Sequence, residues 1–341
     1  MVPNFTICIP SWNRGEAALR QVRHTLPLID EKWEILVLDN CSTRDLEGYK
    51  EISLLSKFDN RVKYIKHAQN GGFHGNIVAC FNFATSPYLQ IISDEDYSNP
   101  RVVVDAIATL DEFPDVGLIR GSIGAVEGMS PRNSAFYVDQ FLSEGRPALD
   151  QFSLTTNYVT GIIYNKRLLE SRGVISRFSS GLVNNPMVAG YAHMYLDILV
   201  SACCAVITSK EIVSFEGEEH SAMPSITLVA QNEAYTFSGR LEQFIGFRNA
   251  FVEVCAQDQL NDLPLLINLY LRLVQKYCTL FLIDGFLYSA RGLSLGPLRE
   301  SLKHFFMAAT EINEFRPVHD MVLSMVQESF GRTLPKVAGH S

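Results

Sequence analysis

The sequence lacks several features that mark particular classes of protein. It has no run rich in lysine and arginine, and its formal net charge is −8 at pH 7, which argues against nucleic acid as the main partner. The same charge disfavours a purely electrostatic attachment to anionic lipid. None of its seven cysteines forms a CxxC pair, so neither a zinc site nor a disulfide framework is indicated. The simplest interpretation is reduced, buried thiols in a cytosolic protein.

From the sequence we also expect no segment that directs the chain to a membrane. The first four residues provide no basic stretch ahead of an apolar one, so we expect no signal peptide. The apolar run 277–290 is broken by Asp284 and Gly285, and we expect it to be too short and too interrupted to span a bilayer. These absences predict a cytoplasmic protein. Peripheral contact with the inner face of the cell membrane stays open as an alternative.

The composition is that of a globular protein, with 47% hydrophobic and 19% charged residues in a chain of 341. This length predicts two domains, or one large domain with an appendage. Apolar strands are predicted at 5–9, 33–38, 62–65 and 88–92, with helices at 16–26 and 77–84 between them. Continuously apolar strands that alternate with helices indicate an α/β fold with a mainly parallel, helix-covered sheet. From about residue 233 the pattern is helical throughout.

The stretch 91–97 contains two apolar residues and a serine, followed by the consecutive acids Asp94, Glu95 and Asp96. This pattern predicts a buried strand that emerges at the edge of a sheet. Neighbouring carboxylates repel one another unless a cation lies between them, and oxygen ligands suit Mg²⁺ or Mn²⁺. A solvated acidic turn without a ligand is the alternative that these residues alone leave open.

Three further polar clusters lie near predicted strand ends, at 10–13, 39–42 and 70–76. In parallel sheets, ligands bind beyond the carboxyl ends of the strands. The glycines of the third cluster allow close approach of the backbone to a ligand, and the N-terminus of the helix that follows favours an anion. We therefore expect the clusters to face one ligand together.

In this order, the four clusters resemble the motifs of family 2 glycosyltransferases with the GT-A fold, a Rossmann-like α/β fold. Residues 7–14 resemble the opening signature and residues 37–43 the second motif. Asn70-Gly71-Gly72 with Asn76 resembles the third motif, and residues 93–96 resemble the metal-binding motif. The resemblance covers roughly the first hundred residues, and the layout is similar to that of short bacterial polysaccharide enzymes of the abequosyltransferase type. It implies a catalytic domain at 1–230, with a nucleotide-sugar half at 1–100 and an acceptor half at 101–230, followed by a helical domain at 231–341.

The resemblance also implies a role for individual residues. Asp39 would bond the nucleotide base, Asp94 would lie near the ribose or sugar, and Asp96 would hold Mn²⁺ or Mg²⁺ on the diphosphate. A serine stands at residue 93, where many relatives carry an aspartate, so the division of labour among the three acids stays open. The implied nucleotide-sugar residues are Pro10, Ser11, Asn13, Asp39, Asn70, Gly72, Asp94 and Glu95.

Inverting members of the family place a carboxylate, often in a Glu-Asp pair, at the start of a later helix as the general base, and no such pair stands here. Instead, His193 lies early in a predicted helix and Asp197 one turn later on the same face. Histidine accepts protons near neutral pH, and an aspartate at this spacing can orient it. Asp197 as the base and a purely structural pair are the alternatives. His220 is a candidate third metal ligand, with a solvated turn as its alternative.

The sequence therefore predicts an inverting, metal-dependent glycosyltransferase. It would move a sugar from a nucleoside diphosphate to a hydroxyl of a glycan or lipid-linked glycan in O-antigen or capsule synthesis. A catalytically silent nucleotide-sugar-binding or scaffold protein is the alternative. A nucleotidyltransferase fits less well, because no glycine-rich loop with Lys or Arg directly follows the first strand. The C-terminal helices are expected to pack on the catalytic domain, with homo-oligomerisation or membrane contact left open.

Overall fold

The computed structural model describes residues 3–126, 135–156, 158–184, 186–217, 236–258, 260, 263–290 and 292–310. The chain divides into two compact units. The first comprises Met1–Asn184 and Tyr191–Ala222, and the second comprises Asn185–Gly190 and Met223–Ser341. The division near residue 230 into a catalytic and a helical domain stays a prediction.

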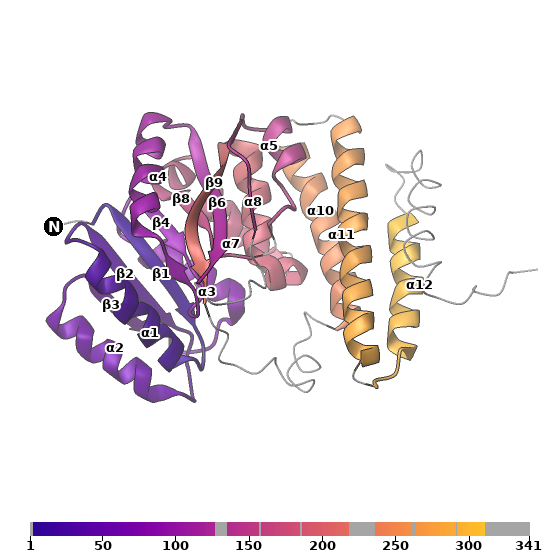
Figure 1. Ribbon diagram of the computed structural model, residues 1–341. Helices are drawn as coiled ribbons and strands as arrows, with labels where there is room; N and C mark the ends of the chain where they lie inside the picture. The colour runs from indigo at the N-terminus through magenta and orange to yellow at the C-terminus, as the bar shows by residue number, and fades with distance from the viewer. Residues whose placement is uncertain are drawn as a thin grey trace, which may run out of the picture. The chain divides into compact units, whose positions relative to one another are not determined.

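The first unit is built on a sheet with the strand order β3-β2-β1-β4-β8-β6-β9-β5, in which β7 also pairs with β9 (Figure 1). Strands β1 to β4 are parallel, whereas β8 runs antiparallel to both of its neighbours. The α/β class with a mainly parallel first half is thus confirmed. The strands are β1 Phe5–Ser11, β2 Trp33–Asp39, β3 Val62–Lys66, β4 Tyr88–Ile91, β5 Tyr97–Ser98, β6 Val116–Ala125, β7 Gln140–Leu142, β8 Ile162–Asn165 and β9 Ala205–Glu216.

Helices cover this sheet because their apolar residues recur on one face. Helix α1 buries Ala18, Leu19 and Val22, which belong to one core with Ile35 and Val37 of β2. The helices are α1 Gly15–Thr25, α2 Leu46–Phe58, α3 Gly72–Phe83, α4 Pro100–Glu112, α5 Arg146–Gln151, α6 Lys166–Ser171, α7 Val174–Asn184 and α8 Ala192–Cys203. The structure also describes two short 3₁₀ helices, η1 Leu26–Leu28 and η2 Pro186–Tyr191.

Several element boundaries differ from the predictions. Helix α3 begins at Gly72, five residues before the predicted start, because its first turn has too few apolar residues to show a helical period. Helix α2 was not predicted, since only Gly48, Tyr49 and Ile52 of its residues are buried. The described part of 128–153, for which no element is predicted above, contains β7 and α5. A close contact pins α2 to α1, because a Cβ on Gly48 would lie 2.2 Å from the carbonyl oxygen of Gly15.

The second unit contains α10 Phe237–Gln257, α11 Leu263–Ala290 and α12 Gly296–Thr310. Its core includes the ring of Phe244, 4.8 Å from that of Phe305, and a buried ion pair between Arg240 Nε and Asp284 Oδ2 at 2.8 Å. Helix α11 continues through Asp284 and Gly285, so these residues interrupt the apolar run without ending the helix. By length and composition alone, Pro264–Ala290 could cross a membrane, with a mean hydropathy of 1.3, although the core helix of a soluble protein passes the same test. The helical pattern predicted from residue 233 onward also includes residues after 310, which lie outside the described residues.

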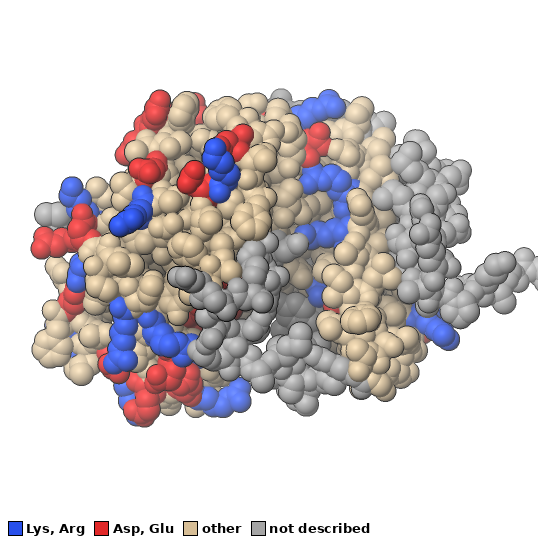
Figure 2. Space-filling view, in the orientation of Figure 1, with Lys and Arg blue, Asp and Glu red and all other residues tan. Residues whose placement is uncertain are grey.

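The charged side chains do not form a continuous basic area on the face shown in Figure 2. Lys and Arg side chains of the described residues lie among Asp and Glu side chains there, most visibly over the part of the first unit that contains α1 and α2. Over α1 and α2 the two signs are thus mixed, in a chain whose formal net charge is −8.

Candidate functional site

The carboxyl ends of β1, β2 and β4 meet at one edge of the sheet. Parallel pairing sets Ser11 beside Asp39 and Cys8 beside Ile91, and the N–H of Asn40 donates to the carbonyl of Ser11 at 2.9 Å. The polar residues that follow these strands are therefore neighbours in space although they are distant in sequence. The polar clusters at 10–13, 39–42 and 94–96, which we expected to share a ligand, therefore lie along this edge.

Asn13 joins the polar cluster at 10–13 to the loop that follows β2. Its backbone is in the left-handed region, with φ of 57°, and its N–H donates to Ser42 Oγ at 2.7 Å. Its side-chain oxygen accepts from the N–H groups of Thr43 and Arg44 at 2.9 and 3.0 Å. Asn13 therefore shapes the edge by holding two loops together. Pro10, half-buried, lies two residues after the middle of β1 and leads into this loop.

Asp39 is fully buried at the end of β2. Its Oδ1 accepts from the N–H of Ser42 and its Oδ2 from the hydroxyl of Tyr64, both at 2.7 Å, and Lys66 Nζ lies 3.7 Å from Oδ2. Burial, together with the bond to Asp39, raises the pKa of the Tyr64 hydroxyl above its ordinary value. Each carboxylate oxygen has a second acceptor position, so these contacts leave Asp39 able to bind a ligand donor.

The third cluster is tied to the second by Asn40. Its Oδ1 accepts from the N–H of Gly71 at 2.9 Å, and its Nδ2 donates to the carbonyl of Gly72 at 3.0 Å. Asn70 caps the same turn, because its Oδ1 accepts from the N–H of Gly72 at 2.8 Å. Gly72 has φ of 71°, a conformation that favours glycine. Asn40 has no predicted role, although it stands beside Asp39 in the second motif.

Asp94 is buried below the first loop. Ser11 Oγ donates to its Oδ2 at 2.7 Å and also bonds the hydroxyl of Tyr49 at 2.6 Å, while Arg14 Nη1 lies 3.2 Å from its Oδ1. Burial raises the pKa of the Asp94 carboxyl to about 8; the Arg14 cation opposes this shift and the neighbouring Glu95 carboxylate adds to it. Burial thus destabilises the ionised form of Asp94 by more than the Arg14 cation stabilises it.

Glu95 and Asp96 are held by separate partners. Glu95 Oε2 forms an ion pair with Arg14 Nη2, and the hydroxyl of Tyr158 lies 3.3 Å from its Oε1. The fully buried Asp96 accepts from Thr160 Oγ1 at 2.6 Å and from the N–H of Gly217 at 3.1 Å. Burial raises the pKa of Asp96 to about 7, which its bond to Thr160 only partly offsets. A cation would therefore stabilise this carboxylate in its ionised form.

The donor atoms fit a metal that shares its coordination with a ligand. In the part of the chain that the structure describes, no three His, Cys, Asp or Glu side chains form a group that could hold a metal ion by themselves. Ions such as Mg²⁺ are often held by one or two carboxylates and by substrate phosphates instead. Asp96 matches that arrangement, because each of its oxygens retains an acceptor position. His220, the other predicted ligand, lies outside the described residues.

Residues 156 and 158–160, here called the hydroxyl segment, contact three acids through alternate side chains. Arg120 Nη1 fixes the backbone of this segment by donating to the carbonyls of Tyr158 and Thr160. These residues were not predicted, since no local sequence pattern distinguishes their three hydroxyl groups from others in the chain. The pairs are Thr156 with Asp197, Tyr158 with Glu95 and Thr160 with Asp96.

His193 and Asp197 reach this edge by different routes. His193 is buried in the first turn of α8, with its ring centre 6.2 Å from that of Phe73 and 6.0 Å from that of Tyr191. Phe73 directly follows Gly72, so His193 lies close to the third cluster. Asp197 is fully buried and accepts a hydrogen bond from Thr156 of the hydroxyl segment.

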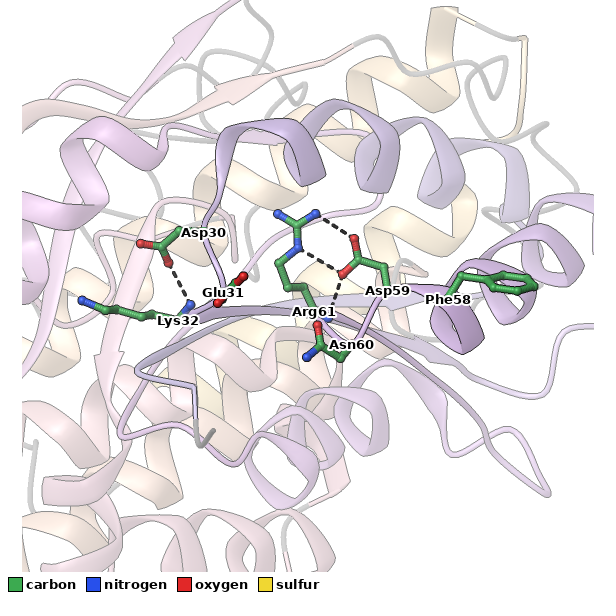
Figure 3. Close-up of a pocket in the computed structure, with 7 residues that line it drawn as sticks. All are labelled: Asp30, Glu31, Lys32, Phe58, Asp59, Asn60 and Arg61. Carbon is green, nitrogen blue, oxygen red and sulfur yellow. Dashed lines mark hydrogen bonds and ion pairs between the residues drawn. The ribbon is translucent and has the colours of Figure 1, made fainter.

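A cavity of about 680 Å³ lies away from these residues, beside the N-terminal ends of β2 and β3 (Figure 3). In Figure 3 the guanidinium of Arg61 turns toward Asp59, while Phe58 points away from both. Arg61 also donates to the carbonyls of Leu26 and Ile29, so it joins the chain segments 26–29 and 59–61. We assign this cavity no chemical role. Its lining residues are Asp30, Glu31, Lys32, Phe58, Asp59, Asn60 and Arg61.

Comparisons with known proteins agree with the layout of this edge. Residues 6–173 match the sequence profile of the family Glycosyl transferase family 2. Over 99 residues the chain is 29% identical to WcaA of Escherichia coli K12, whose description is a colanic acid biosynthesis glycosyl transferase. That match covers 29% of this chain and 35% of WcaA, so it spans about a third of the relative's length.

Solved structures share the fold at low sequence identity. TarS 1–349 of S. aureus in complex with UDP has a TM-score of 0.60 and 15% identity, over 99% of this chain and 94% of that one. The same protein in complex with UDP-GlcNAc has a TM-score of 0.59 and 15% identity, over 98% and 93% of the two chains. The likeness extends over nearly the whole of both chains, so it includes the C-terminal helices.

Proposed function

Because this chain belongs to glycosyl transferase family 2 and is thus a glycosyltransferase with the GT-A fold, we propose that it moves a sugar from a nucleoside diphosphate to a glycan hydroxyl with inversion. The observation that carries the proposal is the buried Asp96 at the end of the β4 segment, beside Asp94 and Glu95 and on the edge that also bears Asp39. The relative linked to colanic acid supports a surface polysaccharide as the product, of the O-antigen or capsule kind.

The nucleotide would bind along the first three clusters. Pro10 and Ser11 would line the base with their backbone, Asp39 would bond it, and the turn at Asn70 and Gly72 would form the wall of the pocket. The fixed turns support this assignment, because their hydrogen bonds preorganise the loops before a ligand arrives. The N-terminus of α3, which begins at this turn, favours the negative charge of a diphosphate.

Asp94, Glu95 and Asp96 would hold the sugar and diphosphate end of the donor. Asp96 is the proposed ligand of Mn²⁺ or Mg²⁺, and such a metal would neutralise the charge that develops on the leaving phosphate. His220 is proposed as a further ligand. It stands three residues after Gly217, whose N–H bonds Asp96, so the chain can reach the metal position over roughly 10 Å.

His193 is the proposed general base, with Asp197 as its rival. A base must come within hydrogen-bond reach of the acceptor hydroxyl. The contact between the rings of His193 and Phe73 supports this role, because it places the imidazole beside the third cluster. Asp197 is more deeply buried and is bonded to Thr156, which favours a positioning role for it. The acceptor glycan, held on a lipid carrier at the cytoplasmic face, would bind on this side.

The second unit has no assigned chemistry. Oligomerisation or peripheral membrane contact through α10 to α12 stays a prediction, as does cytoplasmic localisation. Binding of a nucleotide-sugar donor is tested by thermal shift with Mn²⁺ and UDP-, GDP-, CDP- or dTDP-sugars. We expect one nucleotide class to raise the melting temperature in a metal-dependent way, because binding to the folded state stabilises it. No shift with any of the four contradicts the proposal, and binding without transfer to any glycan acceptor favours a silent binding protein.

A further inference from the structure

The guanidinium of Arg14 bridges two acids of the proposed donor site. Its Nη1 lies 3.2 Å from Asp94 Oδ1, and its Nη2 forms an ion pair with Glu95 Oε2. The side chain of Arg14 is 29% exposed, whereas those of Asp94 and Glu95 are 5% and 14% exposed. Arg14 is thus the most solvent-accessible member of the cluster. A ligand that approaches the acids from water meets this cation first.

The backbone of Arg14 is held in place from two sides. Its N–H donates to the hydroxyl of Tyr49 at 3.1 Å, and the same hydroxyl bonds Ser11 Oγ at 2.6 Å. A Cβ on the next residue, Gly15, would lie 2.2 Å from the carbonyl oxygen of Asp45, and a Cβ on Gly48 would lie 2.2 Å from the carbonyl oxygen of Gly15. The backbone is therefore fixed, while the long arginine side chain retains several rotamers that reach different parts of the edge.

The charge of the cluster changes when a donor binds. Ionised, Asp94, Glu95 and Asp96 carry three negative charges against the single positive charge of Arg14. With a divalent cation at Asp96, the acids depend less on Arg14 for their stabilisation. A diphosphate then presents oxygens that a guanidinium bonds in a bidentate way.

We propose that Arg14 is a movable counter-ion that holds Asp94 and Glu95 in the donor-free enzyme and turns to the diphosphate of the bound donor. This inference rests on the proposed function. Arg14 would then have two opposite effects on ligand binding. Before the donor binds, the cation opposes a metal by charge repulsion; afterwards, it holds the phosphate. An arginine that only supports the fold would affect metal and nucleotide binding in the same direction.

Two binding measurements on full-length Arg14→Ala separate these roles. Mn²⁺ binding in the absence of nucleotide is followed by electron paramagnetic resonance of the free ion. Binding of UDP, GDP, CDP and dTDP at saturating Mn²⁺ is followed by calorimetry. We expect Arg14→Ala to bind Mn²⁺ at least as tightly as the wild type. Its affinity for the preferred nucleotide should fall about tenfold or more, which is the loss of one charge-assisted hydrogen bond.

Arg61→Ala is the matched control, because Arg61 also pairs with a carboxylate but lies beside the cavity at the other end of the sheet strands. We expect it to leave both affinities unchanged. If Arg14→Ala does not fold, Arg14→Lys keeps the charge without the planar fork. It should bind Mn²⁺ like the wild type and the nucleotide several-fold more weakly.

Parallel weakening of both affinities, or nucleotide binding equal to that of the wild type, overturns the proposal. These results leave the proposed function standing as long as the wild type binds a nucleoside diphosphate with Mn²⁺. If the wild type binds none of the four nucleotides, the proposed function and the role of Arg14 fail together.

Discussion

Two arginines, Arg14 and Arg61, form ion pairs at opposite ends of the parallel strands, and they serve different purposes. Arg61 bonds the half-buried Asp59 two residues away and donates to two backbone carbonyls. Arg14 instead bridges Asp94 and Glu95, acids that lie 80 and 81 positions further along the sequence. One arginine ties the chain to itself locally, while the other gathers charge around a place where a ligand would bind.

The pKa values of the partner acids show the physical difference. The hydrogen bond from Arg61 lowers the pKa of Asp59 below its ordinary value, because the pair is close to water and burial costs little. Burial raises the pKa of Asp94 to about 8 in spite of Arg14. An ion pair thus stabilises an acid fully only where desolvation is small. At the edge formed by the carboxyl ends of β1, β2 and β4, the effect of burial on Asp94 remains larger than that of Arg14. A metal and its ligand would offset the difference.

The largest expected effect on this comparison comes from Asp96→Asn. The amide keeps the size, its single oxygen can still accept from the N–H of Gly217, and its NH₂ can donate to the hydroxyl of Thr160. The substitution removes the charge, so transfer should fall at least about a hundredfold while the fold survives. Sugar transfer and the melting temperature are measured together. Asp59→Asn, at the other end of the strands, is the control and should keep full activity. Turnover by Asp96→Asn that matches the wild type in the presence of a chelator would rule out the metal role.

His193→Ala is expected to have the next largest effect. Loss of a general base should lower kcat about 10²- to 10⁴-fold, while donor affinity changes little. Steady-state kinetics and nucleotide calorimetry separate the two quantities. His24→Ala, which removes a histidine on α1, serves as the control and should keep kcat. If kcat and donor affinity fell equally for His193→Ala, the histidine would be structural.

Arg61→Ala should change stability and leave catalysis intact. It removes the partner of Asp59 and leaves the carbonyls of Leu26 and Ile29 without their donor, so the free energy of unfolding should fall by about 1–3 kcal/mol. Denaturant unfolding measures this loss, and transfer kinetics should match the wild type. A clear change in KM for the donor would mean that the cavity at Arg61 communicates with the carboxyl edge.

The smallest expected effect is the pH dependence of the Asp59 pair. Because the folded pKa of Asp59 lies below its ordinary value of 3.8, the pair stabilises the protein above that pH, and this contribution is lost as pH falls through the folded pKa. Asp59→Asn should therefore unfold more easily than the wild type at pH 6, with the difference shrinking below pH 3.8. A difference that stays constant with pH would contradict this assignment.

The edge could be predicted from the sequence because parallel strands carry their polar ends to the same side. The positions of Asp39, Asp94 and Asp96 follow from that rule. The bridge from Arg14 could not, since it depends on the left-handed turn at Asn13 and on the packing of α1 against α2. The partners of Asp96 were also hidden, because Thr160 and Gly217 lie 64 and 121 positions away and belong to no local pattern.

The hydroxyl segment has a consequence for how the site can vary. Its side chains at 156, 158 and 160 each bond a different acid, and Arg120 clamps the intervening backbone. Deleting or inserting one residue within this stretch would change the alternation that directs the hydroxyls to their acids, whereas a point substitution removes only one contact. Divergent copies of this enzyme should therefore tolerate side-chain changes here far better than changes in length.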